Sequence, residues 1–257
     1  MRYVAIGDSF TEGVGDELPD GSSRGWADRV AAGLAATGND GVRYANLAIR
    51  GRLLEPIVTD QLDAALSLDP APTLLTLNGG GNDMLRPRTD VDRLVALTAH
   101  AVRRCADAGV RLVLLSGADP SARLPFGRAV RQRGEALTAR IAELAGAHGL
   151  DFVDVFHDSE IRHPAYWSPD RLHLNATGHQ RVAELVLDAL GEPTAARAVR
   201  PDSPETHRLL TELRYYREHV LPWIGRRLRG RSSGDGRTGK YVGWIPVPPG
   251  QPSRACT

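Results

Sequence analysis

The chain has 257 residues, of which 42% are hydrophobic and 25% are charged, and its formal net charge is +1. These values lie close to the averages for soluble globular proteins, so the whole-chain charge gives no case for a nucleic-acid-binding protein. No run approaches the roughly 18 consecutive apolar residues that a membrane span needs. No secretory signal pattern is found either, and we therefore expect a cytoplasmic protein without an integral membrane segment.

The charge is unevenly distributed along the sequence. Residues 1–199 contain 21 Arg and 26 Asp or Glu, whereas residues 200–257 contain 11 Arg or Lys and 5 Asp or Glu. A basic C-terminal region beside an acidic body favours docking to an anionic surface or to the body itself, although a solvated basic end is the simpler interpretation. The two cysteines, Cys105 and Cys256, do not form a disulfide framework.

Apolar runs of strand length alternate with segments of helical periodicity over residues 1–190. The predicted strands are 2–7, 42–48, 73–78, 111–115 and 151–155. The predicted helices are 26–37, 53–66, 91–108, 128–148 and 176–190. Five strands that alternate with helices indicate right-handed βαβ units, hence a parallel sheet with helices on both faces.

A domain edge is predicted near Gly191, which gives a domain over 1–191 and an extension over 192–257. In the extension, 204–220 has the spacing of an amphipathic helix and 223–229 that of a short basic helix. Residues 230–239 are rich in Gly, Ser and Arg and are expected to be mobile, and 244–249 to be extended. The apolar stripe of 204–220 favours packing on the first domain over self-association or contact with an anionic surface.

Candidate functional residues follow four of the five predicted strands. Ser9 follows the first strand, Gly51 lies after the second, Asn82 lies after the third, and Asp170 and His173 lie in the long loop after the fifth. The carboxyl ends of parallel strands meet at one edge of a sheet, where open α/β folds place their chemistry. A serine, a base with a carboxylate, and hydrogen-bond donors for an oxyanion are what acyl transfer requires.

Each of these residues also has a purely structural interpretation. Ser9 can be an ordinary turn residue, Gly51 can serve only a positive φ angle, and the glycines before Asn82 can form a flexible loop. Asp170 and His173 can be a surface ion pair. A phosphate-binding loop is a weaker interpretation, because the sequence has neither the spacing nor the lysine of a P-loop. The combination at the ends of different strands favours catalysis.

The motifs resemble the SGNH hydrolase superfamily, also known as GDSL esterases and lipases. The resemblance covers about residues 1–190 and rests on four blocks: Gly7-Asp8-Ser9, Gly51, Gly80-Gly81-Asn82-Asp83, and Asp170-Arg171-Leu172-His173. It implies a flavodoxin-like, three-layer α/β/α fold with a five-stranded parallel sheet. It also implies a serine esterase that acts on a small-molecule ester and uses no cofactor.

The family pattern implies roles for individual residues. Ser9 would be the nucleophile, His173 the general base and Asp170 its orienting carboxylate, with the N–H groups of Ser9 and Gly51 and the Asn82 amide as the oxyanion hole. Asp8, Gly80 and Asp83 would support the site. No histidine pair has the spacing of a zinc site, so no metal is expected.

Several alternatives remain open at this stage. The same residues could serve an acyltransferase or a thioesterase, and a non-catalytic binding module is a less favoured alternative. Arg50 and Arg52 flank Gly51 and could meet an anionic part of a substrate, or could be solvated loop arginines. The acyl length and leaving group depend on the loops 16–24, 84–90, 117–127 and 156–168, whose shapes do not follow from the sequence. The oligomeric state is equally open.

Overall fold

The computed structural model describes residues 1–37, 41–124, 127–192 and 234–248. The predicted helices 204–220 and 223–229 lie outside these residues. A six-stranded sheet forms the middle layer, in the order β5-β4-β3-β1-β2-β6. Its strands are β1 Arg2–Ile6, β2 Arg43–Asn46, β3 Leu74–Asn78, β4 Arg111–Leu115, β5 Asp151–Val153 and β6 Tyr241–Pro246.

Strands β1 to β5 are parallel, which confirms the predicted five-stranded parallel arrangement. The sixth strand was not predicted. β6 runs antiparallel to β2, with Tyr44 opposite Ile245 and Asn46 opposite Tyr241. Residues 244–246 of the expected extended segment 244–249 belong to a strand that starts at Tyr241 and adds an edge to the sheet. Pro246 suits such an edge strand, because a proline has no N–H to donate to a further strand.

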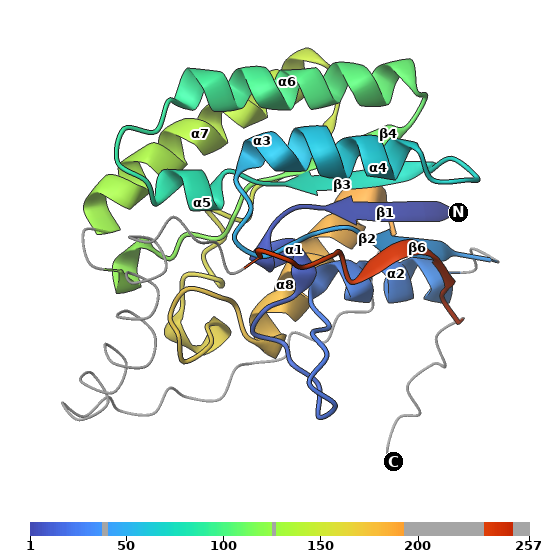
Figure 1. Ribbon diagram of the computed structural model, residues 1–257. Helices are drawn as coiled ribbons and strands as arrows, with labels where there is room; N and C mark the ends of the chain where they lie inside the picture. The colour runs from blue at the N-terminus through green and yellow to red at the C-terminus, as the bar shows by residue number, and fades with distance from the viewer. Residues whose placement is uncertain (38–40, 125–126, 193–233, 249–257) are drawn as a thin grey trace.

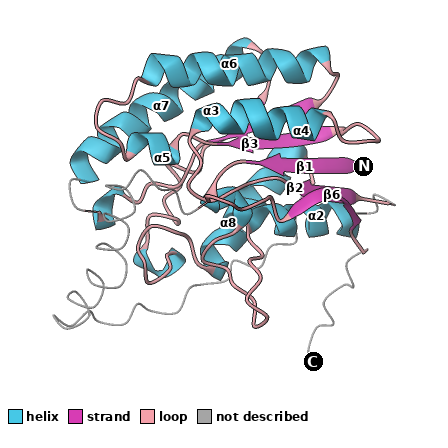
Figure 2. Cartoon of the chain, in the orientation of Figure 1, coloured by secondary structure: helices cyan, strands magenta, loops and turns pink. Residues whose placement is uncertain are grey.

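Helices cover both faces of the sheet (Figures 1 and 2). The helices are α1 Ser9–Glu12, α2 Trp26–Ala36, α3 Leu54–Pro56, α4 Leu62–Leu66, α5 Gly81–Met84, α6 Val91–Asp107, α7 Gly127–Ala147 and α8 Ala176–Leu190. A π-helical turn, Ile57–Gln61, joins α3 to α4, and short 3-10 turns lie at Ser121–Arg123 and Pro164–Tyr166.

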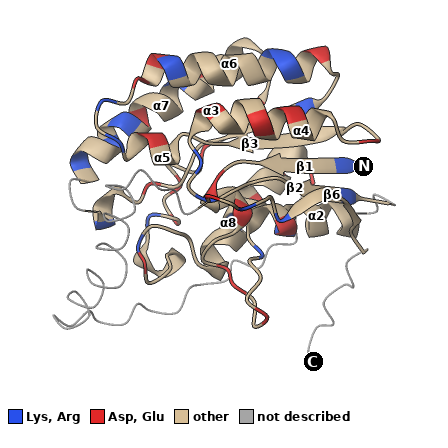
Figure 3. Cartoon of the chain, viewed as in Figure 1, with Lys and Arg blue, Asp and Glu red and all other residues tan. Residues whose placement is uncertain are grey.

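The alternation of side chains along β1 divides the core into two clusters. Tyr3 and Ala5 pack with residues of α2 and α8, whereas Val4 and Ile6 pack with residues of α3, α4, α6 and α7. β3 is buried along its whole length, as expected for a central strand covered on both faces. Acidic residues lie along α3 and α4, and charged residues of both signs lie along α6 (Figure 3). The helices thus bury one apolar stripe and expose a mixed polar face.

Local capping explains where several helices begin and end. The Asn175 side chain accepts hydrogen bonds from the backbone N–H groups of Thr177 and Gly178, both at 3.0 Å, and starts α8. Gly191, at φ 78°, ends the same helix in the left-handed conformation. Within the described ranges, no helix is long and apolar enough to cross a membrane.

Candidate functional site

Ser9 is the first residue of α1, directly after the turn that leaves β1. The Asp8 carboxylate caps this helix by accepting a hydrogen bond from the Phe10 N–H at 3.1 Å. The N–H groups of a first helical turn have no acceptor within the helix, so the Ser9 N–H is suited to bind an external acceptor. Because β1 and β3 are adjacent, the turn lies beside the end of β3, which leads to Asn82.

Gln61 holds the strand end in front of this turn. Its side-chain carbonyl accepts a hydrogen bond from the Gly7 N–H at 2.8 Å, and its amide donates to the Gly7 carbonyl at 3.0 Å. Gln61 lies in the π-helical turn, where we predicted a continuous helix over 53–66. Turns of this kind are frequent at functional sites. The sequence reasoning missed Gln61, because an isolated glutamine in a helical segment gives no signal.

The structure brings Ser9, His173 and Asp170 into one chain of hydrogen bonds. His173 Nε2 lies 3.0 Å from Ser9 Oγ, and His173 Nδ1 lies 2.5 Å from Asp170 Oδ2. Asp170 Oδ1 accepts hydrogen bonds from Ser168 Oγ at 2.6 Å and from the His173 N–H at 3.0 Å. Burial raises the pKa of Asp170, but the hydrogen bonds with His173 and Ser168 outweigh burial and hold it well below its usual range.

Two residues fix the loop that carries His173 against the rest of the fold. A Cβ on Gly15 would lie 2.0 Å from the Leu174 carbonyl oxygen, so only glycine permits this close approach. His179, fully buried, accepts from the Trp26 N–H at 3.2 Å and lies 3.1 Å from the Val14 carbonyl. Burial lowers the pKa of His179 to about 4, so this histidine is neutral and structural at ordinary pH.

Asn82 connects the Ser9 turn to the Gly51 loop. Its side-chain amide donates to Asp8 Oδ2 at 2.9 Å and to the Arg52 carbonyl at 3.0 Å. Asp8 precedes Ser9 and Arg52 follows Gly51, so the amide lies between these two backbone segments. Gly51 has φ 76°, the positive angle that the sequence suggested. Both hydrogens of the Asn82 amide have acceptors here, so one must be shared or redirected if Asn82 binds an oxyanion.

The three residues that were expected to support the site, Asp8, Gly80 and Asp83, lie around this arrangement. Gly80, at φ 91°, precedes the helix that carries Asn82, and Asp83 accepts a hydrogen bond from the Leu54 N–H at 3.0 Å. Burial raises the pKa of Asp83, and burial also raises the pKa of Asp8 to about 6. The Asp8 carboxylate therefore loses its charge, and part of its ability to accept from Asn82, as the pH falls through about 6.

Arg50 has a structural partner. The Glu12 carboxylate accepts hydrogen bonds from the Arg50 backbone N–H at 2.6 Å, from Nε at 2.8 Å and from Nη2 at 2.5 Å. The guanidinium is thus bound to the last residue of α1. This contact fixes the Gly51 loop to the helix that starts at Ser9, and it favours the structural interpretation of Arg50 over substrate binding.

A second Asp-x-x-His pair lies after β5. His157 Nδ1 is 2.8 Å from Asp154 Oδ2, and Asp154 Oδ1 accepts from the His157 N–H at 3.1 Å. His157 Nε2 lies 4.0 Å from the Glu135 carboxylate. This pair therefore has the internal geometry of Asp170 and His173, with a different group in front of the second ring nitrogen.

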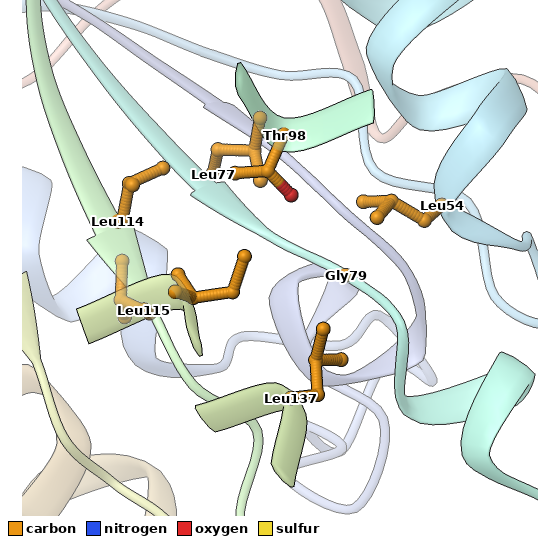
Figure 4. A pocket seen from close by; sticks show the side chains of 8 residues that line it. Leu54, Leu77, Gly79, Thr98, Leu114, Leu115 and Leu137 are labelled. Atoms are coloured by element: carbon orange, nitrogen blue, oxygen red, sulfur yellow. The ribbon is translucent and has the colours of Figure 1, made fainter. Parts of the chain in front are cut away.

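A small apolar cavity lies under the loop that follows β3 (Figure 4). Its volume is about 20 Å³, and Leu54, Leu77, Gly79 and Leu137 are among the residues that line it. A cavity of this size accommodates about one water molecule. Leu54, Leu77 and Leu137 belong to the core cluster of α3, α6 and α7, so the cavity is a packing defect of the core and is too small for an acyl chain.

Comparison with solved structures shows the same fold in several esterases and lipases. The lipase Lip_vut3 from a goat rumen metagenome is 19% identical, with a TM-score of 0.61, over 74% of this chain and 97% of that one. The esterase EstA from Pseudoalteromonas sp. is 18% identical, with a TM-score of 0.59, over 74% and 97%. The acetyl xylan esterase AlAXEase is 19% identical, with a TM-score of 0.58, over 74% and 100%.

A search of curated proteins by sequence found no significant match. The family model for the GDSL-like lipase/acylhydrolase family, in contrast, matches residues 5–181, which is more than half of the chain. The match includes the Ser9 turn, Gly51, Asn82 and the Asp170–His173 pair. The chain thus belongs to the GDSL-like lipase/acylhydrolase family and is an ester-hydrolysing enzyme.

Proposed function

We propose that the enzyme hydrolyses carboxylic esters through an acyl intermediate on Ser9. The observation that carries this proposal is the unbroken chain from Ser9 Oγ to His173 at 3.0 Å and from His173 to Asp170 at 2.5 Å. A serine hydroxyl is a weak nucleophile without a base in hydrogen-bond contact, and this geometry supplies that base and a carboxylate to orient it.

In the first step, Ser9 Oγ attacks the ester carbonyl carbon while His173 Nε2 accepts the hydroxyl proton. The resulting imidazolium is stabilised by Asp170, whose low pKa keeps it ionised. His173 then returns the proton to the leaving alcohol, and the acyl group stays on Ser9. Water, deprotonated by the same histidine, attacks the acyl-enzyme and releases the acid.

The negative charge of each tetrahedral intermediate needs donors on the opposite side from His173. We assign this role to the backbone N–H groups of Ser9 and Gly51 and to the Asn82 amide. The amide's contacts with the residues next to Ser9 and Gly51 support this assignment. Asp8, Gly80 and Asp83 keep these donors in place and take no part in proton transfer.

The substrates that we propose are short-chain acyl esters, acetylated sugars or lysolipid-like esters. The test is a panel of p-nitrophenyl esters of increasing acyl length, acetylated sugars and a lysophospholipid, with wild type beside Ser9→Ala. Wild type should hydrolyse at least one class, and Ser9→Ala should abolish that hydrolysis with the fold retained. Full activity of Ser9→Ala would refute the mechanism.

Two additions to the panel separate hydrolysis from related reactions at the same residues. A thioester of the preferred acyl group tests thioesterase activity, and an added alcohol tests transfer of the acyl group. A phosphonate probe tests the nucleophile directly, and EstA has been solved inhibited by monoethylphosphonate. Mass spectrometry should find the phosphonyl group on Ser9 in wild type and none on the protein in Ser9→Ala.

A further inference from the structure

Lys240, which precedes β6, has its ammonium group enclosed by oxygen atoms. Its Nζ donates to the carbonyls of Glu12 at 3.0 Å, Ser23 at 2.7 Å and Arg24 at 2.7 Å, and it lies 2.7 Å from Asp28 Oδ2. The side chain is 12% exposed. Removing a largely buried charge of this kind leaves several polar groups without a partner, which is strongly destabilising locally.

The oxygen atoms around Lys240 belong to segments that frame the site. Glu12 ends the helix that begins at Ser9. Ser23 and Arg24 end the loop whose Gly15 lies against the Leu174 backbone and the His173 Cβ. One ammonium group therefore joins the nucleophile helix to the loop behind His173, although residue 240 lies outside the part of the chain that matches the family.

A polar network continues from Lys240 toward the Gly51 loop. Asp28 also forms a hydrogen bond with the Tyr44 side chain, and the Tyr44 hydroxyl accepts from the Asn46 amide at 2.9 Å. The same amide donates to the Thr11 carbonyl at 3.0 Å, and the Asn46 side-chain carbonyl accepts from the Ala48 N–H at 3.1 Å. The network thus contacts α1 and the first residues of the Gly51 loop.

The residues before Lys240 pack directly on that loop. A Cβ on Gly234 would lie 2.2 Å from the Arg50 carbonyl oxygen, and one on Gly239 would lie 2.6 Å from Leu47 Cα. Residues 234–239 therefore lie against the segment 46–51. The physical reason is that glycine lets two backbones approach closely.

We propose that the segment 234–240 is a positioning element of the active site, and that Lys240 holds the Ser9 helix and the Gly51 loop at the spacing that the oxyanion requires. The inference rests on the proposed function of Ser9 and Gly51. Lys240 is a positioning residue, because it contacts neither the reacting atoms nor His173. The segment thereby makes catalysis depend on residues beyond those that match the family.

The kinetic test replaces Lys240 by methionine, which keeps an unbranched side chain one atom shorter than that of lysine and removes its charge. Lys240→Met should lower kcat by about 10- to 100-fold, the scale of a small displacement of catalytic groups, with KM changed less than about twofold. The rate of Ser9 phosphonylation should fall by a similar factor, because the phosphonyl oxygen uses the same donors. The matched control is Trp244→Phe, which removes the hydrogen bond from Trp244 Nε1 to the Pro70 carbonyl, in the strand that follows Lys240. It should leave kcat unchanged.

A second measurement does not depend on activity. Amide hydrogen exchange in peptides covering 7–14 and 46–52 should be faster in Lys240→Met than in wild type, while exchange in β4 stays the same. If Lys240→Met does not fold, Asp28→Asn should show the same pattern with a smaller amplitude. Unchanged exchange in both peptides, or unchanged kcat despite faster exchange, would overturn the inference. Full activity of Ser9→Ala would refute the proposed function instead, which is a separate result.

Discussion

The chain contains two Asp-x-x-His pairs with nearly the same internal geometry. In one, Asp170 Oδ2 lies 2.5 Å from His173 Nδ1, and in the other, Asp154 Oδ2 lies 2.8 Å from His157 Nδ1. Each aspartate also accepts from the backbone N–H of its histidine. A serine hydroxyl contacts each aspartate as well, Ser168 at 2.6 Å and Ser116 at 3.4 Å.

The two pairs differ in their surroundings. His173 Nε2 faces a serine hydroxyl at 3.0 Å, whereas His157 Nε2 faces a carboxylate at 4.0 Å. The side chain of His173 is 19% exposed and that of His157 is 41% exposed. An aspartate that orients a histidine thus occurs twice in this chain and does not by itself make a catalytic site. We infer that chemistry depends on which group the second nitrogen meets and on exclusion of water around it.

Replacing each histidine by alanine tests the comparison most strongly. His173→Ala should lower kcat by about 10⁵-fold or more, because the serine loses its base. His157→Ala is the matched control for losing an Asp-x-x-His pair. It should leave kcat within about twofold of wild type, because His157 Nε2 faces a carboxylate and not a serine hydroxyl. Initial rates on the best p-nitrophenyl ester measure both. Comparable losses in the two variants would break the distinction between the pairs.

Replacing the two aspartates should change kcat unequally, in the same direction as replacing the two histidines but with a smaller difference. Asp170→Asn should lower kcat by about 10³- to 10⁴-fold, because the amide favours the wrong histidine tautomer and does not stabilise the imidazolium. Asp154→Asn should have no comparable effect. Rates for both variants against wild type give the answer, and a loss of activity in Asp154→Asn would show that the second pair also supports catalysis.

The donors around Ser9 are a further difference from the second pair. Asn82→Ala should lower kcat by about 10²- to 10³-fold with little change in KM, as expected for a donor that binds the oxyanion more strongly than the substrate carbonyl. Steady-state kinetics at saturating ester measure this effect. Thermal unfolding should accompany the assay, because Asn82 also bridges Asp8 and Arg52. A change confined to KM would contradict the assignment.

The smallest expected effect concerns stability at acid pH. The pKa of Asp170 is lowered in the folded protein, so its contribution is present above the unfolded value of about 3.9 and is lost as the pH falls through the lower folded value. Asp170→Asn should therefore be less stable than wild type at pH 6, by roughly 2 kcal/mol, and the difference should shrink below about pH 4. Urea unfolding at several pH values measures it. A difference that is independent of pH would contradict the linkage.

Much of the sheet and the meeting of the four motif blocks could be predicted from the sequence. The five parallel strands follow from their apolar runs, and the strand ends bring Ser9, Asn82 and the His173 loop together. The spacing alone does not distinguish Asp170 and His173 from Asp154 and His157, and the resemblance to the family selected the first pair. Gln61, Glu12 and Lys240 were also missed, because their roles come from contacts with backbone atoms of distant segments that leave no local pattern.

The pairing of β6 with β2 has a consequence for how the protein is made. Arg43 and Pro246 are register partners, so about 200 residues of synthesis separate the two strands, and at 5–20 residues per second this takes roughly 10–40 s. During that interval the β2 edge is open to pairing with other chains, and the oxygens that later bind Lys240 lack its ammonium group. Under the proposed role of Lys240, a nascent chain carries its nucleophile early but becomes fully active only when residue 240 has been added. Ser9 is therefore synthesised well before the contacts that make it fully reactive.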